Sequence, residues 1–243
     1  MSHFTFTQAD GSSRSVKGYR YAPPKAASKR YVGGSSVSRL PAKVDLRKFM
    51  TPIEQQGGTN SCTANATAGA YEYLIKRHLG EEAYDVSRLF IYYNGRAVQD
   101  PNNIEDQGLF LQCAIDGLQQ HGACSEETWP FDEDMVNDEP SAEAYEEAKQ
   151  FLIEENELVP TDLTAWKSAL AEGNPILFGM RLFGSFDKHK RPGLVPEPSA
   201  AETGRKDHGA HAMLCVGYSD PDQVFIVRNS WGPDWGDKGY CYI

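Results

Sequence analysis

The chain has 243 residues, of which 40% are hydrophobic and 24% are charged, which is ordinary for a globular protein with one domain or two lobes. Its formal net charge of -10 disfavours nucleic acid and anionic membranes as partners, because like charges repel. No segment is apolar for long enough to span a bilayer, and the N-terminus lacks the basic and apolar regions of a secretory signal. We therefore expect no nucleic-acid or membrane partner, and either a cytoplasmic location or export by a signal-independent route.

The five cysteines are odd in number and widely spaced, and no two of them form a C-x-x-C pair of the kind that binds zinc or transfers electrons. We expect four buried thiols that pack as small hydrophobic side chains and one thiol with a chemical role. This pattern fits a reducing compartment or a fold that does not depend on disulfides. The cysteines are Cys62, Cys113, Cys124, Cys215 and Cys241.

Residues 1–40 are rich in Ser, Gly, Lys and Arg and lack the apolar periodicity that a core of their own would require. We interpret them as an extended arm that is ordered only where it lies against the rest of the chain. After Pro41, helical patterns dominate. The predicted helices span residues 62–78, 109–120, 141–154 and 164–172, with Ser61 as N-cap of the first and Gly80, Gly122 and Gly173 as stop signals.

From Pro175 the pattern changes to strands, which are apolar and partly β-branched. The predicted strands begin at Ile176 and span residues 212–218, 223–229 and 239–243. The last strand ends with the sequence, so we expect the natural chain to continue. A mainly helical front and a mainly stranded back predict an α+β fold with two lobes.

Cys62 stands at the predicted N-terminus of a helix, where unpaired N–H groups and the positive end of the helix dipole favour thiolate over thiol. Gln56 lies six residues earlier, and its amide can donate to the oxyanion of a tetrahedral intermediate together with the backbone N–H of Cys62. The alternative interpretation of Cys62 is a small buried residue that opens a helix. Gln55 is the neighbour that could be mistaken for Gln56.

His211 opens a predicted strand that would hold its imidazole at the edge of a cleft, where it could accept the proton of Cys62 and return it to a leaving amine. His208 lies three residues earlier, at the end of a polar loop over residues 186–209. We prefer His211 because the apolar strand follows it directly. The two histidines as a metal site are the weaker interpretation, since no third ligand is evident.

Asn229 ends a predicted strand, and its amide oxygen could accept from the imidazole and so fix its orientation and tautomer. Trp231 is the expected apolar cover that keeps water away from this hydrogen bond. A lone Cys with a distant His and a distant Asn is the pattern of a thiolate–imidazolium nucleophile oriented by an amide.

At these residues the chain resembles the papain-like cysteine peptidases, over about residues 40–243. The motifs that carry the resemblance are Gln56-Gly57 with Ser61-Cys62, Ser87 to Asn94, Trp129-Pro130-Phe131, His211 to Tyr218, and Asn229-Ser230-Trp231-Gly232. The segment Ser61-Cys62-Thr63-Ala64-Asn65-Ala66 resembles the corresponding segment in the bacterial branch of the family.

The resemblance implies two lobes with a substrate cleft between them, a helical lobe at about 54–155 and a β-rich lobe at about 156–243 plus 41–53. It implies peptide hydrolysis through an acyl-enzyme, without metal or cofactor, with a peptide or protein as substrate. Cys62 is then the nucleophile, His211 the general base, Asn229 its orienter and Gln56 the oxyanion donor. Gly108, Gly179, Ala210 and Trp231 are the implied substrate contacts.

The chain departs from the family pattern at three places. Thr59 stands where secreted relatives have a disulfide cysteine, and Thr63 replaces the aromatic residue usual after the nucleophile. Asp106-Gln107-Gly108 replaces a Cys-Asn-Gly-Gly run, which leaves the register of Gly108 open. Only residues 1–40 precede the core, whereas the family propeptide is much longer. We hypothesise that part of the arm between Tyr19 and Gly33 runs through the cleft and blocks it; the alternative is a plain disordered tail.

Two other functions remain open at this point. An acyl transferase of the transglutaminase or transpeptidase type would use the same Cys62 and His211 but pass the acyl group to an amine. A catalytically silent binding protein could keep the fold, although the complete set of Gln56, Cys62, His211 and Asn229 argues against it.

Overall fold

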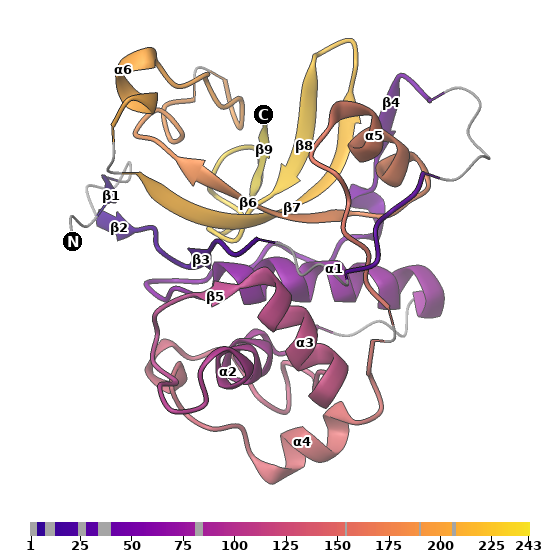
Figure 1. The fold of residues 1–243 in the computed structure, drawn as a ribbon, viewed down its shortest axis with the longest axis vertical. Coiled ribbons are helices and arrows are strands. Elements are labelled where there is room, and N and C mark those ends of the chain that lie inside the picture. Colours follow the sequence, from indigo (N-terminus) through magenta and orange to yellow (C-terminus); the bar gives the residue numbers. More distant parts are fainter. Residues whose placement is uncertain are drawn as a thin grey trace.

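The computed structural model describes residues 4–7, 13–23, 28–33, 40–80, 85–153, 155–189, 191–205 and 208–243. Two lobes lie one above the other in Figure 1, with a sheet in the upper lobe and a group of helices in the lower. The long helix α1 (Cys62–Leu79) runs along their junction and packs on both. None of the helices among the described residues is long and apolar enough to cross a membrane.

The helical lobe is built on α1, α2 (Arg88–Gln99) and α3 (Leu111–His121), with α4 (Ala142–Ala148) at its far end. Small residues on α1 allow the close packing, because Ala64 and Ala68 are buried against Ile91, Ala114 and Leu118. Short elements complete the lobe: the strand β5 (Leu109–Phe110) and the 3-10 turn η3 (Glu133–Met135).

The β-rich lobe is an antiparallel sheet centred on β7 (Gly209–Ser219), the longest strand. β7 pairs with β4 (Lys43–Asp45), β6 (Ile176–Leu182) and β8 (Val224–Arg228), and β8 pairs with β9 (Tyr240–Tyr242). The helix α5 (Leu163–Ala171) covers the sheet, and its Leu170 is buried with Leu214 of β7. The short helix α6 (Ala200–Thr203) and the 3-10 turn η1 (Arg47–Phe49) complete this lobe.

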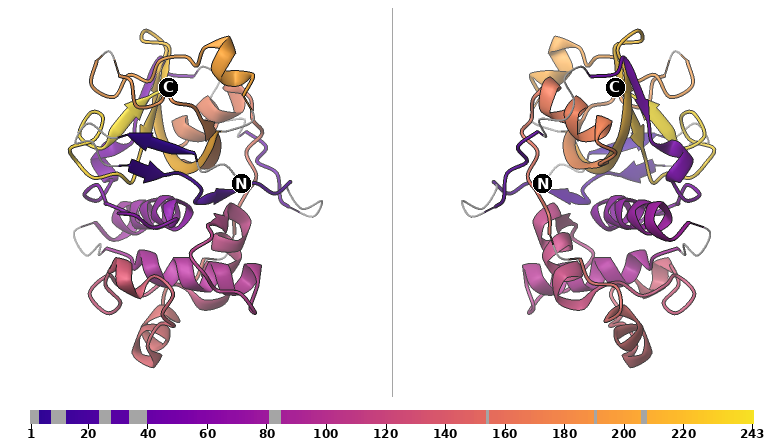
Figure 2. Two further views of the ribbon diagram at one scale, coloured as in Figure 1. Left: turned by 90° about the vertical axis from the view of Figure 1, so that its left-hand side faces the viewer. Right: turned by 90° about the vertical axis from the view of Figure 1, so that its right-hand side faces the viewer.

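The N-terminal segment lies between the two lobes as extended chain (Figures 1 and 2). It includes the antiparallel pair β1 (Thr5–Thr7) and β2 (Ser13–Ser15), followed by β3 (Tyr19–Arg20), which pairs in parallel with β5. Farther along, Tyr31 N–H donates to the carbonyl of Leu158 at 3.0 Å. The arm predicted over residues 1–40 is therefore extended where it is described; its residues 1–3, 8–12, 24–27 and 34–39 lie outside the described part.

The helices and strands predicted from the sequence match observed ones, apart from differences at their ends. The helix at 141–154 ends at Ala148, and the one at 109–120 begins at Leu111 because Leu109 and Phe110 pair with the arm. α2, β4 and α6 were not predicted from the sequence, although Ser87 caps α2 by accepting from Phe90 N–H.

A buried charged side chain ties the β-rich lobe to α1. Arg228, at the end of β8, donates to the carbonyls of Thr51 and Pro52, each at 2.6 Å, and its Nη2 lies 4.0 Å from the carboxylate of Glu72 on α1. Thr51 Oγ1 and the N–H of Val86 donate to the same carboxylate. Burial raises the pKa of Glu72, and the charge of Arg228 opposes this rise.

We expect Arg228→Ala to lower the free energy of unfolding by about 3 kcal/mol, because it leaves the Glu72 carboxylate buried without its cation. Arg47→Ala is the matched control: it breaks the half-exposed pair with Asp45, for which about 1 kcal/mol or less is expected. Urea denaturation of both variants measures the difference. Equal losses would show that the buried cation does not stabilise the lobe junction.

Candidate active site

Cys62 is the first residue of α1, and the loop before it is held by side-chain hydrogen bonds. Ser61 occupies the N-cap position but makes no side-chain cap. Its hydroxyl instead lies 2.7 Å from Thr59 Oγ1 and accepts from Asn65 Nδ2 at 2.9 Å. The prediction that the Ser61 side chain caps the helix is therefore wrong: Ser61 stands at the N-cap position, but its hydroxyl hydrogen-bonds with Thr59 and Asn65 instead.

The sulfur of Cys62 is fully buried beneath the N-terminal arm. A Cβ added to Gly18 would lie 2.5 Å from Cys62 Sγ and 2.5 Å from the carbonyl oxygen of Asn60. Burial raises the pKa of Cys62 to about 12, although the backbone N–H groups of Ala212 and Thr63 act in the opposite direction. The sequence predicted a lowered thiol pKa from the helix N-terminus; with the arm in place, desolvation outweighs that effect.

His211 lies on β7, next to Ala212, whose backbone interacts with the Cys62 sulfur. Its Nε2 lies 2.7 Å from Asn229 Oδ1, and the ring of Trp231 is centred 4.8 Å from the imidazole. The imidazole is almost fully buried, which lowers its pKa to about 4; the Asn229 hydrogen bond raises it and the charge of Arg14 lowers it further. Under the arm, the neutral thiol and neutral imidazole are therefore the favoured forms.

Ser230 connects the residues on either side of the cleft. Its N–H donates to Asn229 Oδ1 at 2.9 Å, and its hydroxyl donates to Gln56 Oε1 at 2.7 Å. The backbone N–H of Gln56 donates to the carbonyl of Ser230, also at 2.9 Å, and Gln56 Nε2 donates to Thr59 O. Hydrogen bonds thus hold both the oxygen and the nitrogen of the Gln56 amide group, and they use only one of the two N–H groups of Nε2.

The four predicted substrate contacts all lie against the arm. A Cβ on Gly108 would meet the carbonyl oxygen of Gly18 at 2.6 Å, and one on Gly179 would meet the ring of Tyr19 at 2.2 Å. Ala210 N–H donates to Val16 O at 3.1 Å, and the guanidinium of Arg14 lies 4.8 Å from the centre of the Trp231 ring. The arm therefore runs past each of these positions and directly over Cys62.

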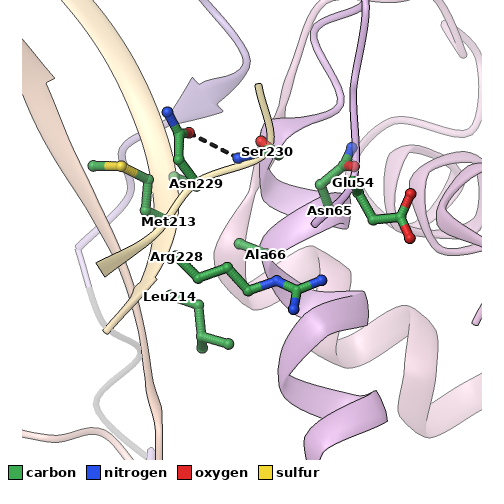
Figure 3. A pocket seen from close by; sticks show the side chains of 9 residues that line it. Glu54, Asn65, Ala66, Met213, Leu214, Arg228, Asn229 and Ser230 are labelled. Carbon is green, nitrogen blue, oxygen red and sulfur yellow. Dashed lines mark hydrogen bonds between the residues drawn. The ribbon is translucent and has the colours of Figure 1, made fainter. Parts of the chain in front are cut away.

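The junction beneath the site is packed rather than open. Figure 3 shows Asn229 and Ser230 on one side, Glu54 and Asn65 on the other, and Arg228 extending towards α1. The cavity between them is about 10 Å³, close to the space that one water molecule needs. A cavity of this size does not accept an organic ligand.

His208 faces a different environment from His211. Its Nδ1 lies 3.0 Å from Gly209 O and its ring packs against Phe183. Among the described residues, no group of three His, Cys, Asp or Glu side chains is arranged to hold a metal ion. None of the five cysteines forms a disulfide; Cys113 on α3 is partly exposed, whereas all four thiols other than the reactive one had been expected to be buried.

Sequence reasoning missed the parts of the site that depend on distant pairing. Ser230 was noted only as part of a motif, yet it hydrogen-bonds with both Asn229 and Gln56. Gly18 carried no signal at all, since its importance comes from the chain that folds beneath it. Tyr19 was named only as one end of the arm segment expected to run through the cleft.

Comparison with known proteins finds relatives that all belong to one family of peptidases. The family model for papain family cysteine proteases matches residues 40–243. An uncharacterized peptidase C1-like protein of Acanthamoeba polyphaga mimivirus is 36% identical over 81% of this chain and 67% of its own length. Pro-cathepsin H of Bos taurus is 28% identical over 93% of this chain and 66% of its own, so the chain spans about two thirds of these curated relatives.

Among solved structures, xylellain, a cysteine protease from Xylella fastidiosa, superposes with a TM-score of 0.80. It is 33% identical, and the alignment covers 94% of this chain and 90% of xylellain. The fold of two lobes, the Cys62 helix and the His211 strand thus occur together in a chain whose family model spans residues 40–243. The protein therefore belongs to the papain family of cysteine peptidases.

Proposed function

We propose that the protein hydrolyses peptide bonds through a thioacyl-enzyme on Cys62, with His211 as general base and acid. The observation that carries this proposal is the 2.7 Å hydrogen bond between His211 Nε2 and Asn229, on a strand whose next residue contacts the Cys62 sulfur. Because Asn229 engages Nε2, the other ring nitrogen, Nδ1, is the one available to Cys62.

The reaction follows from these positions. With the cleft open, the thiol proton passes to His211 and the thiolate attacks the peptide carbonyl, forming the C–S bond. The imidazolium then gives its proton to the leaving amine as the C–N bond breaks. A water molecule, deprotonated by His211, attacks the thioester, and the C–S bond breaks to release the acid and regenerate Cys62.

Gln56 is the proposed oxyanion donor. Its free Nε2–H and the backbone N–H of Cys62 would donate to the oxygen that becomes negative in the tetrahedral intermediate. The hydrogen bonds from Ser230 and to Thr59 support this role, because a donor already held in place needs no rearrangement during the reaction.

We also propose that the arm inhibits the enzyme of which it is part. Support comes from Gly18 against the sulfur, from the hydrogen bond of Leu109 N–H to Gly18 O at 2.8 Å, and from Tyr19 against Gly179. A second anchor of the arm consists of Tyr31, which donates to Leu158 O, and of Lys29, which lies between Glu155 and Glu157 at 2.6 and 3.1 Å. The close fit of Tyr19 to Gly179 also favours substrates that place an aromatic side chain there.

Product analysis tests the reaction against its alternatives. Hydrolysis predicts a free carboxylic acid from a peptide substrate, also in the presence of an added primary amine, and no turnover by Cys62→Ala. Amide formation with the added amine as the main product would instead support an acyl transferase. Binding of the peptide without turnover by the unblocked protein would support a silent binding protein.

We expect His211→Ala to reduce kcat/KM more than Asn229→Ala does. Loss of His211 removes the proton carrier, whereas loss of Asn229 leaves the imidazole in place but less well oriented, a difference of at least about tenfold. Steady-state kinetics on one peptide substrate measures both variants. Equal losses would mean that Asn229 has another role.

We expect Gly18→Ala to open the arm. The added Cβ would lie 2.5 Å from both the Cys62 sulfur and Asn60 O, so the arm must move away. Gly33→Ala is the matched control in the same arm, since its Cβ would have no neighbour closer than 3.6 Å. Labelling of Cys62 by iodoacetamide, read by intact mass, should be at least about tenfold faster in Gly18→Ala only. Equal rates in both variants would contradict the inhibitory contact.

We expect the arm to loosen as the pH falls from about 7 towards 4. Covered His211 has a pKa of about 4, below its ordinary 6.5, so protonation in this window favours the open form, in which the imidazole meets water. Hydrogen exchange of Leu109 and Ala210 amides, corrected for the intrinsic pH effect, reports the arm contacts.

The His211→Gln variant is the control for this pH effect, because it cannot be protonated. It should lose most of the dependence on pH. An unchanged dependence would show that the buried imidazole does not control the arm, and would point to Glu155, whose pKa the Lys29 ammonium lowers.

A further inference from the structure

Two separate backbone stretches form the walls of the cleft around Cys62. One is Asn60, whose carbonyl oxygen faces Gly18 of the arm, and the other is Gly108, which faces the carbonyl oxygen of the same Gly18. No disulfide joins these walls, since none of the five cysteines forms one. Gly18, which lies over the sulfur, contacts both walls, so their separation sets the width of the space above Cys62.

A line of hydrogen bonds connects the two walls through α2. Gly108 N–H donates to the hydroxyl of Tyr92 at 3.0 Å, and that hydroxyl donates to Asp106 Oδ1 at 2.6 Å. The same carboxylate oxygen accepts from the backbone N–H of Asn60 at 2.9 Å. Asn60 Nδ2 also donates to the backbone carbonyl of Asp106 at 2.9 Å, so the contact has two points.

The chemistry of this line suits a permanent connection. The Tyr92 ring is fully buried, and burial followed by the nearby Asp106 carboxylate raises its pKa, so the phenol keeps the proton that it donates. The guanidinium of Arg96 lies 3.8 Å from the centre of that ring, and its Nε donates to Tyr92 O at 3.1 Å. A charged acceptor gives stronger hydrogen bonds than a neutral one, which fits a carboxylate at the centre of the line.

We propose that Tyr92 and Asp106 are positioning residues that set the separation of the Asn60 and Gly108 walls. They do through hydrogen bonds what a covalent cross-link between the walls would do, and their action does not depend on redox conditions. Neither residue touches the reacting atoms. The proposal concerns the peptidase site proposed above, but its first test does not depend on turnover.

The first test is amide hydrogen exchange in the full chain, comparing Tyr92→Phe with wild type. Removing the hydroxyl takes away the acceptor of Gly108 N–H and one donor to Asp106, so exchange should be about tenfold faster at both Gly108 and Asn60. Tyr93→Phe, the next residue on α2, is the control and should leave both amides unchanged. Faster exchange at Gly108 with unchanged exchange at Asn60 would overturn the coupling of the walls.

A second pair of variants covers the case in which Tyr92→Phe does not fold. Asp106→Asn keeps one acceptor oxygen, whereas Asp106→Ala removes both. Exchange at Asn60 should therefore rise in the order wild type, Asp106→Asn, Asp106→Ala. Equal exchange in all three folded proteins would overturn the role of the carboxylate.

Labelling then separates positioning from general loss of structure. In the full chain carrying Gly18→Ala, Tyr92→Phe should slow labelling of Cys62 by a peptide epoxide about tenfold, because that probe lies between the walls. Labelling by iodoacetamide, which needs only the thiolate, should change less than about twofold. A parallel loss with both reagents would overturn the proposal, whereas failure of the parent protein to turn over peptides would bear only on the proposed function.

Discussion

The central physical constraint on this site is that the reactive form of the proposed Cys62–His211 pair is charged, whereas both side chains are buried away from water beneath the arm. A thiolate and an imidazolium are stabilised by water or by groups that replace water, and burial disfavours both. Beneath the arm, Cys62 and His211 are buried, and their pKa values move apart, to about 12 and about 4. In the proposed inhibition, the arm thus acts on the proposed catalytic pair in two ways, by occupying the cleft and by removing the solvent that the ion pair needs. Arg14 adds a positive charge near the imidazole and acts in the same direction.

Hydrogen bonds outside the arm hold the polar groups of the site in place. Asn229 and Ser230 follow directly after β8, whose last residue, Arg228, is bonded to Thr51 and Pro52 and lies near Glu72. Ser230 in turn holds the side chain of Gln56 by donating a hydrogen bond to its Oε1. On the opposite wall, Tyr92 and Asp106 connect the loop before Cys62 to Gly108. These connections come from elements that lie far apart in the sequence and that the fold brings to one cleft.

Local signals explain which parts could be predicted from the sequence. The helix at Cys62 was predictable because Ser61 precedes it, small residues fill it and Gly80 ends it. The strand at His211 was predictable from its unbroken apolar run. α2 was missed although Ser87 caps it, because its apolar residues were assigned only to a family motif.

Long-range pairing explains the rest. Leu109 and Phe110 were predicted as helical but form a strand, because their backbone pairs with the arm. The raised pKa of Cys62 could not be foreseen, since the helix N-terminus is visible in the sequence whereas the covering Gly18 is not. Tyr92 and Asp106 stand 14 residues apart without a motif to join them, and only the folded loop brings hydroxyl and carboxylate together.

The most direct measurement is covalent labelling with an irreversible peptide epoxide, read by intact mass and peptide mapping. It is made on the full chain and on a chain that starts near Leu40. We expect a single adduct on Cys62 that forms much faster in the shortened chain. Equal rates would support the peptidase but contradict inhibition by the arm, and a folded protein without any adduct on Cys62 would contradict the role of Cys62 as nucleophile.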